Sequence, residues 1–96
     1  MAKYVVLYRL TPEGAKNIKG TVARARETRK ANEARGFKVL NLLWTQGPYD
    51  LVAVIDAPSE EAMMAGMLNV VSAGNVMSTT MRAFDENEME AAVKKA

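Results

Sequence analysis

Hydrophobic and polar positions divide the chain into segments of two kinds. Four segments are rich in β-branched, leucine or aromatic residues, and in the first three nearly every position is apolar, which is typical of buried strands. Two longer stretches repeat apolar positions three and four residues apart, the period of an amphipathic helix. The predicted strands are residues 3–10, 37–45, 50–57 and 75–84, and the predicted helices are residues 12–35 and 59–73.

Capping signals set the ends of both helices. Thr11 can accept a hydrogen bond at the start of the first helix, and Pro12 suits its first position. Gly36 is a good left-handed terminator for the same helix. Ser59 and Gly74 bracket the second helix in a similar way.

The predicted order of elements is strand, helix, strand, strand, helix, strand, followed by a short acidic tail helix over residues 86–95. Two interleaved strand–helix–strand units form a four-stranded antiparallel sheet with both helices on one face. This arrangement is the ferredoxin-like βαββαβ sandwich of the α+β class. The length of 96 residues suits one small domain, so we expect a single domain over residues 1–96.

The continuous apolar runs predict that both faces of the sheet are covered. The two helices cover one face, and in a chain this short the simplest cover for the other is the sheet of a second copy. We therefore expect a homodimer or higher oligomer, with Val6 on the face between the two sheets. A further apolar stripe on the second helix, Met64, Leu68 and Val71, indicates additional assembly.

The segment Gly47-Pro48-Tyr49-Asp50 has two interpretations. In the structural one, which we favour, Gly47 and Pro48 shape a tight turn, Tyr49 packs, and Asp50 accepts hydrogen bonds from N–H groups of the turn. In the functional one, Tyr49 and Asp50 form the rim of a pocket whose wall is Trp44.

Polar-tipped side chains on the strands and the turn are candidates for binding a small molecule. Arg82 can pair with a carboxylate or a phosphate, and the rings of Tyr8 and Trp44 can stack on an aromatic molecule. Aromatic residues are also common in a core with only their polar tip in water. The predicted substrate-binding residues are Tyr8, Trp44, Tyr49, Asp50 and Arg82.

The chain contains neither cysteine nor histidine. This excludes disulfides, zinc sites built from Cys or His, and every triad that needs His. Among the carboxylates, Asp50 and Asp56 lie on one strand about 20 Å apart, too far to act as a pair. The methionines are more simply gap-filling core residues than copper ligands. We assign no catalytic residue, metal site or cofactor.

The charges are unevenly distributed along the chain. Residues 1–48 hold ten Lys and Arg against three Asp and Glu, whereas residues 49–96 hold three against eight. The basic first helix lacks a glycine-rich phosphate loop, and the sheet lacks the paired aromatics of an RNA-binding sheet, so we do not expect nucleic-acid binding. No signal peptide or long apolar run is present, and we expect a cytoplasmic protein without membrane contact.

Four blocks of sequence resemble a known family. They are residues 10–19 (LTPEGAKNIK), 44–52 (WTQGPYDLV), 56–62 (DAPSEEA) and 74–84 (GNVMSTTMRAF). With these blocks the chain resembles the GYD-domain family of small bacterial proteins, which is related in architecture to the dimeric α/β-barrel proteins. The resemblance implies the ferredoxin-like fold and oligomerisation, and it implies no particular reaction or ligand.

Three functional hypotheses follow from the sequence. The first is a homo-oligomeric small-molecule-binding or accessory protein without catalytic activity of its own. The second is a small cofactor-independent enzyme of the dimeric α/β-barrel type that uses Tyr8, Asp50 or Arg82. The third is a structural or protein-interaction module. A ligand-binding protein needs a cavity with converging polar groups, an enzyme also needs a residue with a perturbed pKa, and a scaffold needs neither.

Overall fold

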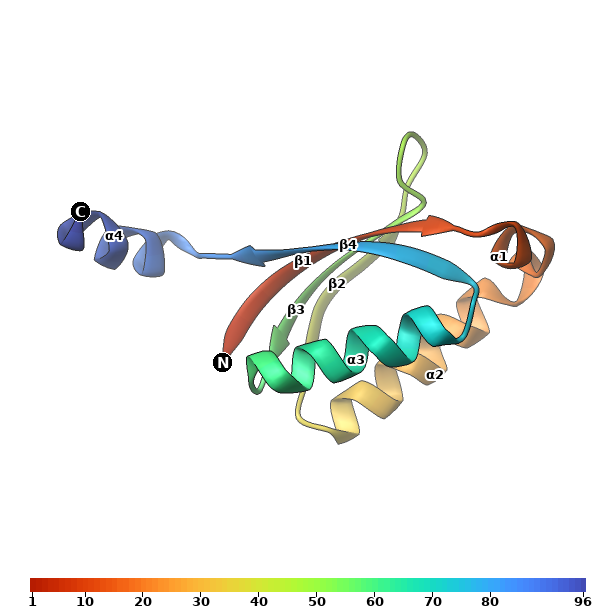
Figure 1. The fold of residues 1–96 in the computed structure, drawn as a ribbon, viewed down its shortest axis with the longest axis horizontal. Coiled ribbons are helices and arrows are strands. Elements are labelled where there is room, and N and C mark those ends of the chain that lie inside the picture. The colour runs from red at the N-terminus through yellow and green to blue at the C-terminus, as the bar shows by residue number, and fades with distance from the viewer.

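The computed structural model describes residues 1–96, and its four strands form one antiparallel sheet. Both long helices lie on the same face of this sheet (Figure 1). The order across the sheet is β2-β3-β1-β4, which confirms the ferredoxin-like α+β fold. The strands are β1 (Ala2–Leu10), β2 (Lys38–Trp44), β3 (Leu51–Ala57) and β4 (Val76–Ala83).

The helical segments begin and end at the residues that favour such ends. Ser59 accepts a hydrogen bond from the N–H of Ala62 at 3.0 Å and so caps the second long helix. Gly36 and Gly74, the expected terminators, have φ angles of 93° and 84°. The segments are α1 (Pro12–Lys16), the 3₁₀ turn η1 (Ile18–Gly20), α2 (Thr21–Ala34), α3 (Glu60–Ser72) and α4 (Glu86–Lys95).

The single first helix predicted over residues 12–35 is wrong, because the structure breaks it into α1, η1 and α2. Asn17 ends α1, and its side-chain amide donates to the Glu13 carboxylate at 3.2 Å. Asn competes with helical hydrogen bonding, and Gly20, at the end of η1, is a poor helix former. Together these residues allow the chain to turn before α2 begins.

The two faces of β1 have different environments. Tyr4, Val6 and Tyr8 share the face that the helices cover, and Val6 is fully buried there at 0% exposure. The expectation that Val6 lies on the uncovered face is therefore wrong. Side chains alternate along a strand, so Val5 and Leu7 occupy that face instead.

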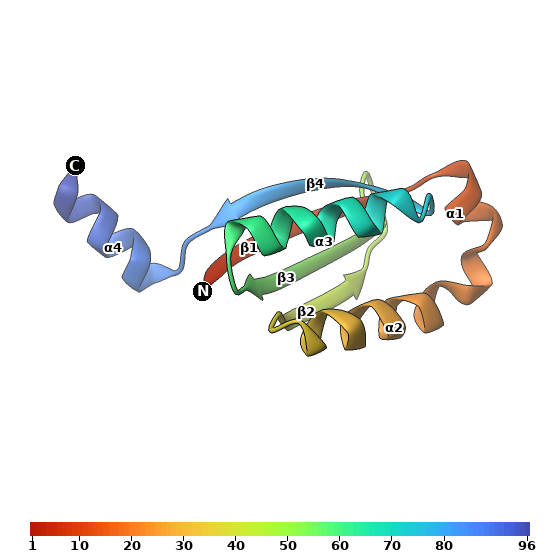
Figure 2. The ribbon, with the colours of Figure 1, turned by 60° about the horizontal axis from the view of Figure 1, so that its bottom comes forward.

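The hydrophobic core lies between the sheet and α3. Met63 of α3 is buried against it, and the ring of Phe37 closes it beside Gly66. In contrast, α2 contributes no buried residue at all. Figure 2 shows α3 crossing the middle of the sheet while α2 lies near β2, apart from α3. The core residues are Tyr4, Val6, Phe37, Ala53, Ile55, Ala57 and Met63.

The face of the sheet opposite the helices is apolar and is not covered by any part of the chain (Figure 1). Leu43 and Met77 on this face are each 57% exposed. The registers of the strand pairs place Val54 at its centre, opposite Val5 on β1 and Asn41 on β2. This open sheet face consists of Val5, Leu7, Leu43, Val52, Val54, Met77 and Met81, with Lys3, Arg9, Lys38, Asn41, Asp56, Thr79 and Ala83 among them.

The tail helix α4 extends beyond the end of β4 and away from the rest of the chain (Figures 1 and 2). Asp85 and Glu88 form a reciprocal capping box at its start, and the helix covers residues 86–95 as the sequence predicts. The Arg82 guanidinium lies 3.7 Å from the Glu88 carboxylate and ties the helix to β4. Two apolar side chains one turn apart, Met89 and Val93, remain exposed.

The start of α1 is fixed to the loop after α3. The Thr11 hydroxyl donates to the carbonyl of Gly74 at 2.6 Å and accepts from the N–H of Gly14 at 3.0 Å. Gly14 lies so close to this loop that a Cβ at its position would be 1.9 Å from the Asn75 carbonyl oxygen. Only glycine allows this contact between two backbones.

We predict that Gly14→Ala lowers the free energy of unfolding by about 3 kcal/mol, because the added methyl group collides with backbone that cannot move freely. Urea denaturation followed by circular dichroism measures this change. Gly66→Ala is the matched control: its Cβ would contact the Phe37 ring at an ordinary 3.5 Å, and stability should hold or rise. Equal stability of the two variants would contradict the assigned contact.

Candidate functional site

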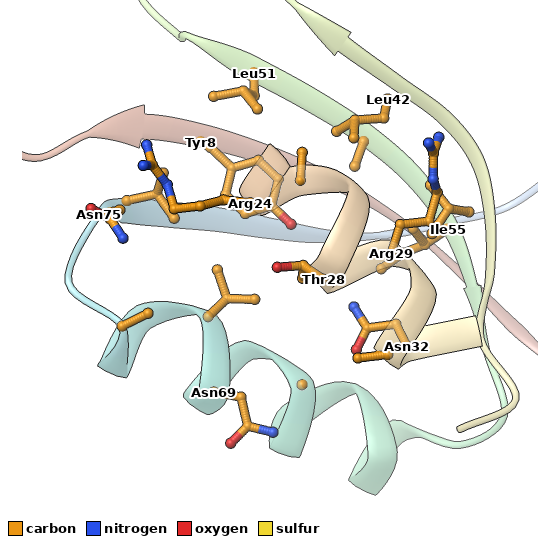
Figure 3. A pocket seen from close by; sticks show the side chains of 18 of the residues that line it. Tyr8, Arg24, Thr28, Arg29, Asn32, Leu42, Leu51, Ile55, Asn69 and Asn75 are labelled. Carbon is orange, nitrogen blue, oxygen red and sulfur yellow. The ribbon is translucent and has the colours of Figure 1, made fainter. Parts of the chain in front are cut away.

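A cavity of about 380 Å³ lies between the sheet, α2 and α3 (Figure 3). It exists because α2 has no large apolar side chain that reaches the sheet, whereas α3 packs closely through Met63. Its volume falls at the lower end of the range for small-molecule sites. The cavity is therefore the candidate functional site.

The sheet and α3 form the apolar side of the cavity. Leu42 from β2 and Leu51 and Ile55 from β3 line it from the sheet. On α3, Gly66 and Val70 line the wall, and Gly66 leaves space there because it has no side chain. The other apolar lining residues outside α2 are Leu10, Val39, Ala53, Ala73 and Val76, and Ala25 and Ala31 line the cavity from α2.

The inner face of α2 forms the polar side. Its polar lining residues recur three and four positions apart, so they share one face of the helix. The hydroxyl of Thr28 and the amide of Asn32 point into the space between the helices (Figure 3). Together with these two, the face includes Thr21, Arg24, Arg29 and Arg35.

Sequence reasoning missed this polar face. The apolar positions of the segment, Ala15, Ile18, Val22 and Ala25, predict the side that faces the sheet and leave Arg24 and Arg29 on the solvated surface. The structure leaves Val22 of that apolar set 43% exposed and turns Arg24 and Arg29 to the cavity. The signal was available in the sequence as Thr21, Arg24, Thr28, Asn32 and Arg35, a polar stripe with the helical period.

The charge of the lining has one sign. Arg24, Arg29 and Arg35 line the cavity, and no Asp or Glu does. The ion pairs of the structure join Lys3 to Asp56, Arg82 to Glu88 and Lys94 to Glu90, so none neutralises these three guanidinium groups. Because Arg24 and Arg29 are half-buried, their charge is less screened than that of an exposed side chain. The cavity thus favours a negatively charged guest.

Tyr8 is the predicted site residue that lines the cavity. Its ring extends from β1, and its hydroxyl points between the sheet and the helices (Figure 3). Burial raises the pKa of the Tyr8 phenol above its ordinary value of 10.0, because the charged phenolate loses hydration. At neutral pH the group is a neutral hydroxyl that can donate one hydrogen bond.

Trp44 lies at the end of β2 beside the cavity without lining it. Its indole N–H donates to the Thr21 hydroxyl at 3.1 Å, and Thr21 does line the cavity. The hydrogen bond ties the end of β2 to the first turn of α2. Trp44 therefore supports a wall of the cavity through Thr21.

Asp50 and Tyr49 lie outside the cavity lining. The carboxylate of Asp50 accepts from the N–H of Leu10 at 2.8 Å, whereas the sequence predicts that its donors lie within the turn. The reason is that β1 continues past the first residue of β3, and the Leu10 N–H needs an acceptor there. The Tyr49 ring lies under the guanidinium of Arg9, 4.9 Å from its centroid.

Arg82 lies near the other end of the sheet, toward α4. Its guanidinium carbon is 4.5 Å from the centroid of Phe84 and 5.8 Å from that of Tyr4. It also pairs with Glu88. The structure therefore does not bring Tyr8, Trp44, Tyr49, Asp50 and Arg82 together at one place.

The arrangement provides for binding: it combines an apolar wall, a cationic wall and neutral hydrogen-bond donors. No group of three or more carboxylates lies close enough to hold a metal ion. No helix of the chain has the length and hydropathy required to cross a bilayer.

We predict that stability falls as the pH rises above about 10, partly because of Tyr8. The unfolded chain releases the phenolic proton near 10.0 and the folded chain only at higher pH, so between the two values the folded state binds more protons. Urea unfolding of the wild type and Tyr8→Phe across this range measures the effect. The variant should lose less stability than the wild type; an equal loss in both proteins would contradict the burial of the phenol.

The chain has relatives among known proteins and known structures. It is 30% identical, over 95 residues that cover 98% of this chain and 100% of the relative, to a Thermus thermophilus protein named "Glutamine synthetase and cystathionine beta-lyase binding protein". The crystal structure of MtbAldR has a similar fold, with a TM-score of 0.67 and 14% identity over 88% of this chain; the match spans 54% of the MtbAldR chain. The model of the GYD domain matches residues 4–93, and the chain belongs to the GYD-domain family.

Proposed function

We propose that this chain is a non-catalytic accessory protein that associates with itself and binds a partner enzyme. The observation that carries the proposal is the full-length similarity to a Thermus thermophilus protein whose name describes it as binding two enzymes. A relationship over 98% of one chain and 100% of the other leaves no extra domain in that relative to account for its binding. The binding surface of a common function would therefore lie on the shared fold.

Two apolar surfaces support a binding role. The first is the open sheet face, which spans all four strands. The second is the outer side of α3, where Met64 is 60% and Leu68 59% exposed one helical turn apart. Clustered exposed apolar side chains of this kind mark interaction sites on soluble proteins.

We assign the open sheet face to a second copy of this chain. Two of its charged members, Lys3 and Asp56, form an ion pair at 2.9 Å within the chain, so the apolar centre can be buried without isolating these two charges. Two such sheets pack face to face about 10 Å apart and enclose the apolar side chains of both. The outer side of α3 then remains accessible for the partner enzyme.

The cavity supports a second function, the binding of a small molecule. It has the volume of a ligand site, one apolar wall and one cationic wall. Its lining comes from α2, α3 and the covered face of the sheet, so both proposed interfaces leave it accessible. Ligand binding and partner binding are compatible in one protein.

We predict that Val54→Asp converts the wild-type dimer into a monomer. The substitution places a carboxylate at the centre of the open sheet face, where burial in a dimer is costly and exposure in a monomer is tolerated. Size-exclusion chromatography with light scattering measures the mass. Val22→Asp on α2 is the control and should stay dimeric; a monomeric wild type, or a dimeric Val54→Asp, would refute the assignment of this face.

We predict that Leu68→Asp weakens binding to a partner enzyme at least about tenfold, because it places a charge in an apolar contact. Biolayer interferometry measures this binding. This protein is immobilised, and the glutamine synthetase and the cystathionine beta-lyase of its own source organism are added in solution. Val22→Asp should bind like the wild type. If wild-type protein binds neither enzyme, the proposal for these partners fails; if Leu68→Asp binds as well as Val22→Asp, the α3 site fails.

A further inference from the structure

We propose that the cavity between the sheet, α2 and α3 selects an amphipathic anion, a carboxylate or phosphate group attached to an apolar body. The proposal rests on the small-molecule function given above and names the chemical class of its ligand. It follows from the division of the lining between an apolar sheet and a cationic helix.

The anionic group is required by the charges of α2. Three arginines line one cavity, and no carboxylate within the chain pairs with them. Guanidinium groups bind the oxygens of carboxylates and phosphates through paired hydrogen bonds.

The neutral polar groups of the lining also suit an oxyanion. The Tyr8 hydroxyl, the Thr28 hydroxyl and the Asn32 amide reach the same space from β1 and α2 (Figure 3). Each can donate a hydrogen bond without adding charge. The phenol of Tyr8 is protonated at neutral pH, and burial raises its pKa further above that range, so it acts as a donor and adds no negative charge to the site.

The apolar body is required by the sheet. Leu42, Leu51 and Ile55 present hydrocarbon to the cavity, and only a ligand with apolar surface gains free energy from covering them. A fully polar anion such as inorganic phosphate would leave these apolar side chains in contact with water. The cavity of about 380 Å³ accommodates a body of roughly ten carbon atoms.

The test uses three probes with the same naphthalene body and the full-length protein. They are 2-naphthoate, 2-naphthyl phosphate and the neutral 2-naphthalenemethanol, with binding measured by isothermal titration calorimetry. We expect at least one anion to bind about tenfold or more tightly than the alcohol. The preference between the two anions then identifies carboxylate or phosphate as the natural head group. Equal affinity of all three probes, or no binding by any, would overturn the proposal.

Two variants on α2 test whether the arginines of the cavity hold the anion. Arg29→Gln removes a guanidinium from the cavity and should weaken binding of the preferred anion about tenfold while leaving the alcohol unchanged. Arg26→Gln removes the same charge from the exposed side of the same helix and should have little effect. Equal losses in the two variants would show a general charge effect and refute the cavity as the site.

Amide chemical shifts give the location independently. The preferred anion should shift resonances of Thr28, Asn32 and Val70, whereas binding at the open sheet face would shift Val54 and Thr79 instead and refute the proposal.

The same variants are assayed for enzyme binding. Lost anion binding in Arg29→Gln with intact enzyme binding separates the cavity from the partner site. If the wild type binds an anion but no enzyme, the accessory function fails and the cavity proposal stands.

Discussion

The antiparallel pairing of β1 and β3, the two apolar central strands, is the interaction on which the rest of the structure depends. Both strands are apolar on both faces, so each face needs a cover. One face is closed by α3 through Met63, and α2 lies beside it with a polar inner surface. The cavity and the open sheet face are two consequences of this single arrangement: a sheet that is apolar on both faces, with both long helices on one of them.

The sequence was sufficient for the fold and insufficient for the site, and the reason is physical. Strand composition, turn glycines and the caps at Thr11 and Ser59 depend on neighbouring residues, and the structure confirms them. The contact of Gly14 with Asn75, beside the break at Asn17, joins residues about 60 positions apart, which no local pattern reveals. The sequence also predicts the wrong face of the sheet for Val6. A run that is apolar at every position does not indicate which of its residues face the helices.

The candidate site shows the same limit. Among the five residues selected from the sequence, the structure places Tyr8 in the cavity, Trp44 behind its wall and the other three elsewhere. Aromatic and charged residues on strands attract attention, whereas a stripe of Thr, Arg and Asn on a helix resembles an ordinary solvated face. This stripe can face the sheet because α2 has no strongly apolar face to turn there instead. The absence of such a face is recognised only when all positions of the helix are compared.

The shallow docking of α2 affects how the protein moves. A helix without a buried side chain gains less free energy from its position than α3 does, so α2 is the long helix whose local opening costs less. The hydrogen bond between Trp44 and Thr21 holds one end of α2, and the loop at Gly36 follows the other. Detachment would expose the apolar wall and widen the entrance to the interior. Slow amide exchange in β1 and β3 beside rapid exchange in α2 would be the signature of this local opening, and a molecule that bridges the helix and the sheet would slow that exchange by holding the two layers together.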